Sequence, residues 1–274
     1  MNARAVVDVI EQVSPIASGM RGDELGFIFG SPENKVSGVA VCWSPTHAVI
    51  RAAERAGCNL IICHEPLFYQ RRWSMDAEAK NVWFDEADDE EKRINRVRKA
   101  ALDAFGGCVY RAHSNWDVVP GIGVLDALAA AFELGEPLRR GRFTAVYAIK
   151  PATLDALARR VQRTLNTGPI RVLGQGERVV RSLGLLIGGL GQMFNSPEEV
   201  VSLGAEAVIA GECLEYTLRH ALELELAVIE AGHCASENPG MRALARFLQE
   251  KLPRVKVLFV DSGTPWRYIV PEGG

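Results

Sequence analysis

The stretch 36-VSGVAVCWSPTHAVIRAAERAGCNLIIC-63 decides the fold class of this chain. Apolar residues fill 36-VSGVAVCW-43 and 59-NLIIC-63, which predicts two buried strands. Between them, 46-THAVIRAAERAG-57 begins with a threonine suited to capping a helix and ends with a glycine, so it predicts a helix. A strand, a helix and a second strand in this order are typical of a parallel sheet covered on both faces.

The same alternation continues along the chain and predicts the α/β class with mainly parallel sheets. Further strands are predicted at 108-CVYRA, 143-FTAVYAI, 170-IRVLG, 181-RSLGLLIGG, 206-EAVIAG, 226-LAVIEAG and 255-VKVLFV. Helices are predicted at 90-EEKRINRVRKAALDAFG, 121-GIGVLDALAAAF, 153-TLDALARRVQRTL, 197-PEEVVSLG, 213-CLEYTLRHALELE and 240-GMRALARFLQEKL. A boundary between two βα halves is expected near 138-LRRGR-142.

The composition is that of an ordinary globular protein. The chain has 274 residues, of which 48% are hydrophobic, and its net charge is only -3, so we expect neither a nucleic-acid patch nor a membrane surface. Asp8 and Glu11 interrupt the apolar positions of the start, which is typical of an amphipathic helix and not of a secretory signal. We therefore expect a cytoplasmic protein. The six cysteines form no CxxC pair, so free thiols are expected.

Two stretches allow alternative interpretations. The acidic run 85-DEADDEEKR-93 is predicted to be the solvated start of a helix, but with Trp73, Trp83 and Phe84 nearby a flap over a site is the alternative. The stretch 185-LLIGGLGQ-192 invites comparison with a phosphate-binding loop. Because it lacks both the GxxxxGK[ST] and the full GxGxxG pattern, a tight strand-to-helix turn is favoured.

Polar residues follow three of the predicted strands, where ligands bind in parallel α/β sheets. His64 and Glu65 follow 59-NLIIC, the stretch 113-HSNWD-117 follows 108-CVYRA, and 233-HCASE-237 follows 226-LAVIEAG. Three of the five histidines of the chain lie at these ends, each with a carboxylate within four residues. The three ends together predict a metal site, although any one of them alone is more typical of a solvated loop or a structural pair.

The spacing of these residues sets conditions on the site. Adjacent strand residues point to opposite faces, so His64 and Glu65 converge only if the strand has ended, as Pro66 indicates. His233 and Glu237 lie four residues apart and share a face if a helix begins there. Imidazole and carboxylate donors suit zinc, manganese, iron or nickel, and they suit two ions bridged by a carboxylate and a water.

Three other polar residues lie in or just before predicted helices. Glu212 follows the strand 206-EAVIAG and is either a general base or anchor near the metals, or a plain helix-start carboxylate. His47 and His220 are expected to be surface or packing residues, because each falls in a predicted helix.

Four motifs in this order resemble the signatures of the NIF-three-like family, which is often labelled GTP cyclohydrolase I type 2. They are 64-HEPLFY-69, 110-YRAHSNWDVVPGIGVLDALA-129, 209-IAGE-212 and 230-EAGHCASENPGMRALA-245. The similarity covers nearly the whole chain, including 22-GDELGFIFG-30 and the glycine-rich stretch in the middle.

The resemblance implies a subunit of two α/β domains packed around a metal cleft. We expect residues 1–137 with 228–274 in the first domain, which carries the metal site, and residues 138–227 in the second. Such subunits would assemble into a toroidal homohexamer, with two divalent metal ions per subunit facing its central cavity. Carried over by position, the implied metal ligands are His64, Glu65, Asp117, His233 and Glu237, with His113 as a neighbour of the metals.

The chain departs from the family's pattern at three places. Glu65 stands where many members have a second histidine, which exchanges a nitrogen donor for an oxygen and tilts the site toward manganese, iron or magnesium. Glu215-Tyr216 replaces a common histidine pair, and Trp43-Ser44 stands where an aspartate is usual. The metal and the substrate of another member therefore do not transfer to this chain.

Two functions are compatible with these residues. The first is a metal-dependent hydrolase acting on a small molecule such as a nucleotide, a phosphate ester or a cyclic amide, with Glu212 or His113 moving protons. The alternative is a non-catalytic metal carrier or regulatory scaffold that forms a ring. An open coordination position would distinguish the hydrolase.

Overall fold

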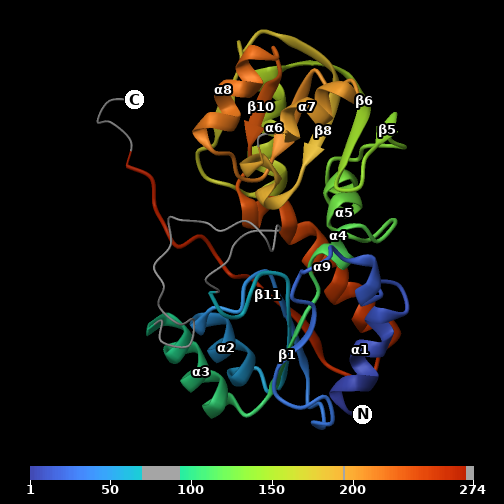
Figure 1. The fold of residues 1–274 in the computed structure, drawn as a ribbon, viewed down its shortest axis with the longest axis vertical. Helices are drawn as coiled ribbons and strands as arrows, with labels where there is room; N and C mark the ends of the chain where they lie inside the picture. Colours follow the sequence, from blue (N-terminus) through green and yellow to red (C-terminus); the bar gives the residue numbers. More distant parts are fainter. Residues whose placement is uncertain (70–92, 194, 270–274) are drawn as a thin grey trace. The chain divides into compact units, whose positions relative to one another are not determined.

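A computed structural model describes residues 1–69, 93–193 and 195–269 (Figure 1). It confirms the α/β class, with two mixed sheets of mainly parallel strands. The chain divides into two compact units: residues 1–119 with 241–262, and residues 120–240 with 263–274. Trp73, Trp83, Phe84 and most of the acidic run at 85–93 lie outside the described residues.

The sheet of the first unit has five strands in the order β1-β4-β3-β2-β11. Their bounds are β1 (Gly26–Phe29), β2 (Val39–Cys42), β3 (Leu60–Cys63), β4 (Cys108–Arg111) and β11 (Val257–Val260). Four of them are parallel, and β1 pairs antiparallel with β4 at one edge. The register aligns Cys42, Cys63 and Arg111, so the residues that follow these strands leave the sheet at one edge.

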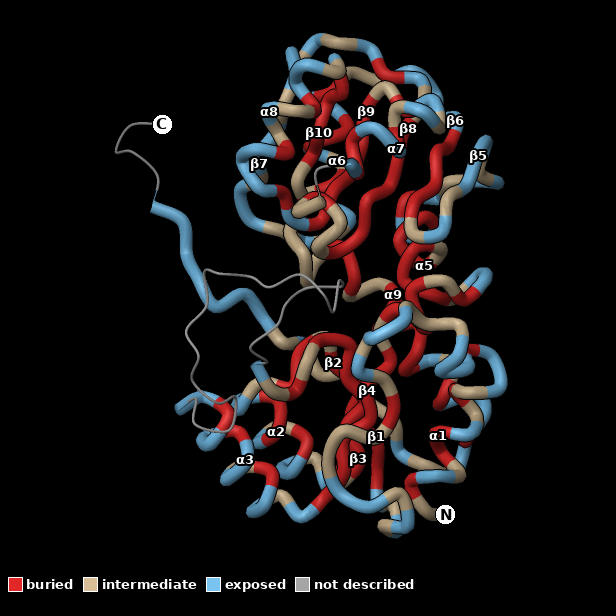
Figure 2. The backbone as a smooth tube through the Cα atoms, in the orientation of Figure 1, coloured by how far each residue is buried: buried red, intermediate tan, exposed pale blue. Residues whose placement is uncertain are grey.

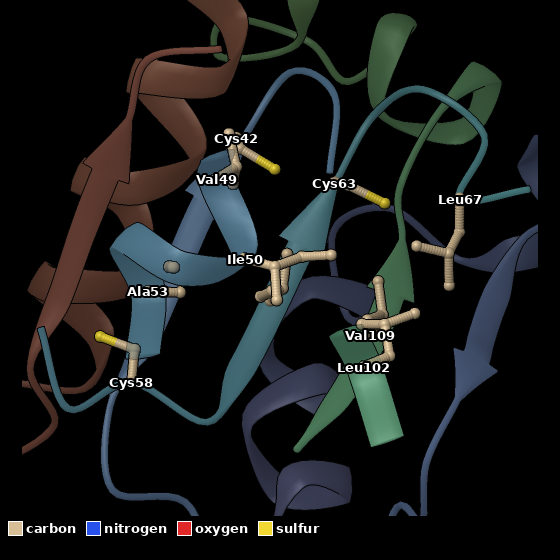
Figure 3. Packing of buried hydrophobic residues seen from close by; sticks show 11 residues of the cluster. Cys42, Val49, Ile50, Ala53, Cys58, Cys63, Leu67, Leu102 and Val109 are labelled. Carbon is tan, nitrogen blue, oxygen red and sulfur yellow. The ribbon is translucent and has the colours of Figure 1, made fainter. Parts of the chain in front are cut away.

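Helices cover both faces of this sheet. On one face, α2 (His47–Arg55) and α3 (Arg93–Phe105) enclose a core that Figure 3 shows, with Ile50 and Leu102 among its fully buried members. On the other face, Tyr110 donates a hydrogen bond to Glu11 of α1 (Ala3–Glu11). Along β4, Val109 faces the core under α2 and α3, and Tyr110 faces α1 on the other side of the sheet. Both faces of the sheet are buried, which explains why the strands are apolar throughout.

The sheet of the second unit has six strands in the order β5-β6-β8-β9-β10-β7. Their bounds are β5 (Arg139–Arg140), β6 (Thr144–Thr153), β7 (Arg171–Leu173), β8 (Val179–Leu186), β9 (Ala207–Ala210) and β10 (Ala227–Glu230). β5, β8, β9 and β10 run one way, and β6 and β7 run the other. Leu186, Ala210 and Glu230 are aligned, so three chain segments leave this sheet at one edge.

The remaining helices are mostly short. They are η1 (Ile16–Ser18), α4 (Ser114–Asp117), α5 (Val124–Ala131), α6 (Leu154–Leu165), η3 (Gly188–Gln192), α7 (Ser196–Ser202), α8 (Glu215–Glu223) and α9 (His233–Lys251). Thr46 caps α2 as the sequence predicts, and Thr153 caps α6 in the same way. Each side chain accepts a backbone hydrogen bond at 3.3 Å. Buried residues gather in the strands of each unit (Figure 2).

The division of the chain differs from the expected one. Residues 228–240 belong to the second unit because β10 pairs with β9 and β7. Residues 120–137 also belong there, since Arg160 of α6 donates to the carbonyl of Phe132 at 2.5 Å. The boundaries between the units lie at 119/120, 240/241 and 262/263, whereas the expected ones were at 137/138 and 227/228.

The last helix also differs from its prediction. The sequence predicted a helix from residue 240, but α9 begins at His233 and continues through Pro239 and Gly240. Among the described residues, no helix combines the length and the apolar character that a membrane crossing requires.

Candidate metal centre

His64 lies at the carboxyl end of β3, in a turn held by the backbone. The strand ends at Cys63, and the amides of His64 and Glu65 both donate to the carbonyl of Trp43, at 3.0 and 2.8 Å. The imidazole is fully buried, and its Nδ1 lies 2.9 Å from the carbonyl oxygen of Ala112. Because a carbonyl only accepts, Nδ1 carries the proton, and Nε2 keeps the lone pair that a metal binds.

Asp117 faces that nitrogen from the helical turn α4. The amide of Asp117 donates to the carbonyl of His113 at 3.0 Å, which turns the chain back toward the end of β3. Its Oδ1 lies 3.4 Å from His64 Nε2. Two donors on one tetrahedral ion with bonds of about 2.0–2.1 Å are separated by roughly the same distance. His64 and Asp117 are thus spaced as two ligands of one ion.

His113 joins this pair. His64, His113 and Asp117 each offer one ligand atom, and these atoms all lie within 4.8 Å of one another. The rings of His64 and His113 meet edge to face, with their centroids 4.7 Å apart. This group of ligand atoms therefore includes His113, which the family resemblance placed beside the metals and not among their ligands.

Asp23 is a residue of this site that the sequence analysis did not assign. It accepts hydrogen bonds from Arg111 Nη1 at 2.7 Å, Ser114 Oγ at 2.5 Å and His113 Nδ1 at 2.8 Å. Burial alone would raise the pKa of Asp23, but the hydrogen bond and charge of His113, the charge of Arg111 and the Ser114 hydrogen bond together hold it well below its usual range. Its segment, 22-GDELGFIFG-30, was noted only as a family resemblance.

Glu65 is buried directly after His64. Because β3 ends at Cys63, His64 and Glu65 both lie beyond the strand, and strand geometry does not force their side chains to opposite faces. His64 and Glu65 each offer one ligand atom, and these two atoms lie within 4.8 Å of one another. Its role as a ligand stays a prediction.

His233 and Glu237 form a second pair, in the first turn of α9. His233 Nε2 lies 3.3 Å from Glu237 Oε2, and the two residues are four apart on the helix, as the sequence analysis required. The carboxylate of Glu237 is buried, whereas the imidazole of His233 is partly accessible. This spacing again suits two ligands of one ion.

Glu212 holds the other nitrogen of His233. Its Oε2 lies 3.1 Å from His233 Nδ1, so the imidazole donates from Nδ1 and presents Nε2 to Glu237. The hydrogen bond from His233 is the largest cause that lowers the pKa of Glu212, against an opposing effect of burial. α8 begins only at Glu215, so Glu212 is an anchor for His233 and not a helix-start carboxylate.

The glycine-rich stretch 185-LLIGGLGQ-192 packs against this second pair. β8 ends at Leu186 and η3 begins at Gly188, so the stretch is a tight strand-to-helix turn, the interpretation that the sequence favoured. A Cβ at Gly188 would overlap Glu237 Oε1, and Gly188 has a φ of +53°. The Gly188 amide donates to Ser236 Oγ at 3.0 Å. The glycine thus makes room for the carboxylate of Glu237.

The other two histidines lie elsewhere. His47 is exposed at the start of α2, and His220 Nε2 lies 2.9 Å from Glu198 Oε1 at the surface of the second unit. Both outcomes agree with the surface or packing roles predicted for them.

The donor set fits a divalent metal of intermediate or hard character. His64, His113 and His233 all direct Nδ1 to an oxygen acceptor, the arrangement in which metal-binding histidines are commonly held. All six cysteines are free, and burial raises the pKa of Cys63, beside His64, to about 12, so its thiol stays protonated. Nitrogen and carboxylate donors therefore characterise both groups.

Comparison with known proteins identifies the family. The sequence model of Duf34/NIF3 (NGG1p interacting factor 3) matches residues 1–265. The chain belongs to the Duf34/NIF3 family. A relative named GTP cyclohydrolase 1 type 2 homolog, from Clostridium perfringens, is 22% identical over 261 residues, which cover 92% of this chain and 93% of the relative. Another of the same name, from Vibrio cholerae, is 30% identical and covers 80% of this chain and 81% of its own length.

Solved structures of Duf34/NIF3 relatives share the fold. The crystal structure of a Bacillus cereus protein related to NIF3 matches with a TM-score of 0.80 at 17% identity, covering 98% of this chain and 99% of that one. At this identity the similarity concerns the fold alone.

Proposed function

We propose that this Duf34/NIF3 protein is a metal-dependent hydrolase. One observation carries the proposal: three histidines each direct Nδ1 to an oxygen acceptor, which leaves the lone pair of Nε2 for a metal. Two of these Nε2 atoms, in His64 and His233, lie 3.3–3.4 Å from a carboxylate oxygen. The names of the relatives, GTP cyclohydrolase 1 type 2 homolog, support a nucleotide, a phosphate ester or a cyclic amide as the substrate class.

We propose two divalent ions per chain, because each unit carries its own histidine and carboxylate pair. His64 and Asp117 would hold one ion, and His233 and Glu237 the other. Glu65 would add an oxygen donor, which favours manganese, iron or magnesium over zinc or nickel.

The residues of the chain would supply position and proton control. A bound divalent ion lowers the pKa of water and polarises a carbonyl or phosphoryl oxygen. Glu212 keeps the proton of His233 on Nδ1, so that Nε2 stays available. About half of the Glu212 side chain is exposed (49%), so the same carboxylate is accessible to a proton from a substrate.

The test joins metal analysis to a hydrolysis screen. Metal content is measured by elemental analysis after purification without added metal and after reconstitution with manganese, iron or zinc. Hydrolysis of nucleotides, phosphate esters and cyclic amides is then compared between the wild type, Asp117→Ala and the control Asp103→Ala, whose carboxylate pairs with Lys99 on the surface. We expect Asp117→Ala to lose at least 100-fold in rate and the control to keep it.

Each outcome decides between the alternatives. Full activity in Asp117→Ala contradicts the hydrolase. Tight metal binding by a wild type that hydrolyses nothing favours the metal carrier or regulatory scaffold. A metal content near zero after reconstitution contradicts both the hydrolase and the metal carrier or scaffold.

We also propose that the chains form a homohexamer, the assembly that the family resemblance implies. Ile94 and Val97, three residues apart on α3, are 43% and 44% exposed, an apolar pair that a neighbouring chain would cover. Light scattering during gel filtration should give about 179 kDa, six times 29.9 kDa. A mass near that of one chain contradicts the proposal.

A further inference from the structure

Asp23 and its neighbours hold the imidazole of His113 in one orientation. Asp23 is held by the buried guanidinium of Arg111, whose Nε also donates to the carbonyl of His64 at 2.8 Å. Ser114 Oγ donates to the same oxygen of Asp23 that faces His113 Nδ1. The carboxylate is therefore anchored from two sides before it meets the imidazole.

The hydrogen bond to Asp23 determines which nitrogen of His113 is available. A carboxylate held by these donors accepts from Nδ1, so the proton of the neutral imidazole lies on Nδ1 and its lone pair on Nε2. His64 is arranged in the same way by the carbonyl of Ala112. Two neighbouring histidines of the first unit are thus in the same metal-binding tautomer.

We propose that His113 is a metal ligand, which completes a three-residue cation site with His64 and Asp117 inside the first unit, and that Asp23 is its positioning residue. One ligand atom from each of the three lies within 4.8 Å of the others. The inference rests on the metal binding proposed above and differs from the implied ligand set, in which His113 is only a neighbour.

This site has a definite chemical character. Two imidazoles and one carboxylate bind zinc, iron, cobalt or manganese, and three protein ligands leave coordination positions for water or substrate. The first unit would then hold an ion through its own residues and keep it open to a substrate.

Titration with Co²⁺, followed by its visible absorption, tests the ligand set. We expect His113→Ala to weaken the binding of one Co²⁺ ion at least 100-fold and to change its absorption, and Asp23→Asn to weaken it about tenfold to 100-fold. Asp23→Glu should restore part of the affinity. The control His47→Ala removes an exposed histidine of the same unit and should leave both ions bound as in the wild type.

A second measurement needs no variant. Proton NMR of the Co²⁺-loaded wild type shows one strongly shifted, exchangeable N–H signal for each coordinated imidazole that keeps a proton. We expect three such signals, from His64, His113 and His233, and the absence of the His113 signal would overturn the inference. A folded His113→Ala that binds Co²⁺ with wild-type affinity and absorption would also overturn the inference, but it would not contradict the proposed metal binding. A wild type that binds no Co²⁺ removes the proposed function as well.

Discussion

At the scale of single residues, Arg111 is the side chain that holds the first candidate metal site together. It is buried, and it joins the loop at Asp23 and Glu24 to the backbone of His64 through hydrogen bonds of 2.7–2.8 Å. The residue ends β4, where an apolar side chain would be expected from the rest of the strand. A charged side chain is accommodated at this buried position because it donates hydrogen bonds to the carboxylate of Asp23 and to the carbonyls of Glu24 and His64.

Arg111→Ala should therefore destabilise the protein by about 3 kcal/mol, because it leaves the buried carboxylate of Asp23 without its ion pair. Urea unfolding followed by circular dichroism measures the change. The control is Arg219→Ala, which removes an exposed pair with Glu215 on α8 and should leave the midpoint unchanged. Equal midpoints for both variants would mean that the buried pair is not stabilising.

The buried cysteines provide a second prediction at this scale. Burial raises the pKa of Cys108 to about 11 and that of Cys213 to about 12. At pH 8 only about one in a thousand Cys108 thiols would be ionised, against about a quarter of ordinary thiols. Native protein should thus be alkylated at these residues at least 100-fold more slowly than protein in urea, with rates that rise with pH.

Mass spectrometry after iodoacetamide treatment follows each residue separately. Alkylation of Cys108 or Cys213 at the same rate with and without urea would contradict the protected thiols that the structure describes.

At the scale of elements, the strand ends position the candidate ligands. In each sheet the parallel register brings the last residues of neighbouring strands to one edge, so that polar residues distant in sequence meet there. Short helical segments follow these strands. α4 places Asp117 four residues after His113, and the start of α9 places Glu237 four residues after His233. Backbone geometry thus sets the ligand spacing.

Gly188→Ala tests this arrangement in the second unit. The new methyl group would overlap Glu237, and we expect it to weaken divalent metal binding at least tenfold by displacing that carboxylate. Gly106→Ala is the matched control: its φ of +64° gives it a similar backbone cost of about 1–2 kcal/mol, but its Cβ would meet nothing within 4 Å. Isothermal titration with Mn²⁺ measures both, and equal affinities would contradict the role of Gly188.

The elements also show what the sequence could predict. Capped helices and apolar strands such as β2, α2 and β3 were predictable because hydrophobic periodicity and local capping decide them. β1 was not predicted, although its residues were noted, because its pairing with β4 is a long-range contact. The predicted start of α9 at residue 240 was wrong, because the helix begins at His233 and continues through Pro239, where a helix is usually interrupted.

For the candidate site, the sequence indicated the pairs His64–Asp117 and His233–Glu237 because their residues follow strand ends. Asp23 could not be found in this way. It precedes its strand and comes to His113 only through a contact that spans 90 residues.

At the scale of the whole molecule, the two units differ in how the chain builds them. All six strands of the second sheet lie within the continuous segment 120–240. The first unit instead needs residues 241–262, which add β11 beside β2 after the chain has completed the second sheet. A continuous segment closes its contacts over shorter loops, which lowers the entropic cost of forming its sheet.

We therefore predict that the fragment 120–240 folds alone, with a cooperative unfolding transition in urea, whereas the fragment 1–119 does not. The matched control is the fragment 120–226, which stops before β10 and so removes the strand that joins β7 to β9. It should lose the transition, since both neighbouring strands would expose their unpaired backbone groups. Circular dichroism and amide exchange would follow the three fragments. A cooperative transition in 120–226, or none in 120–240, would mean that the stability of the second unit does not reside in its own sheet.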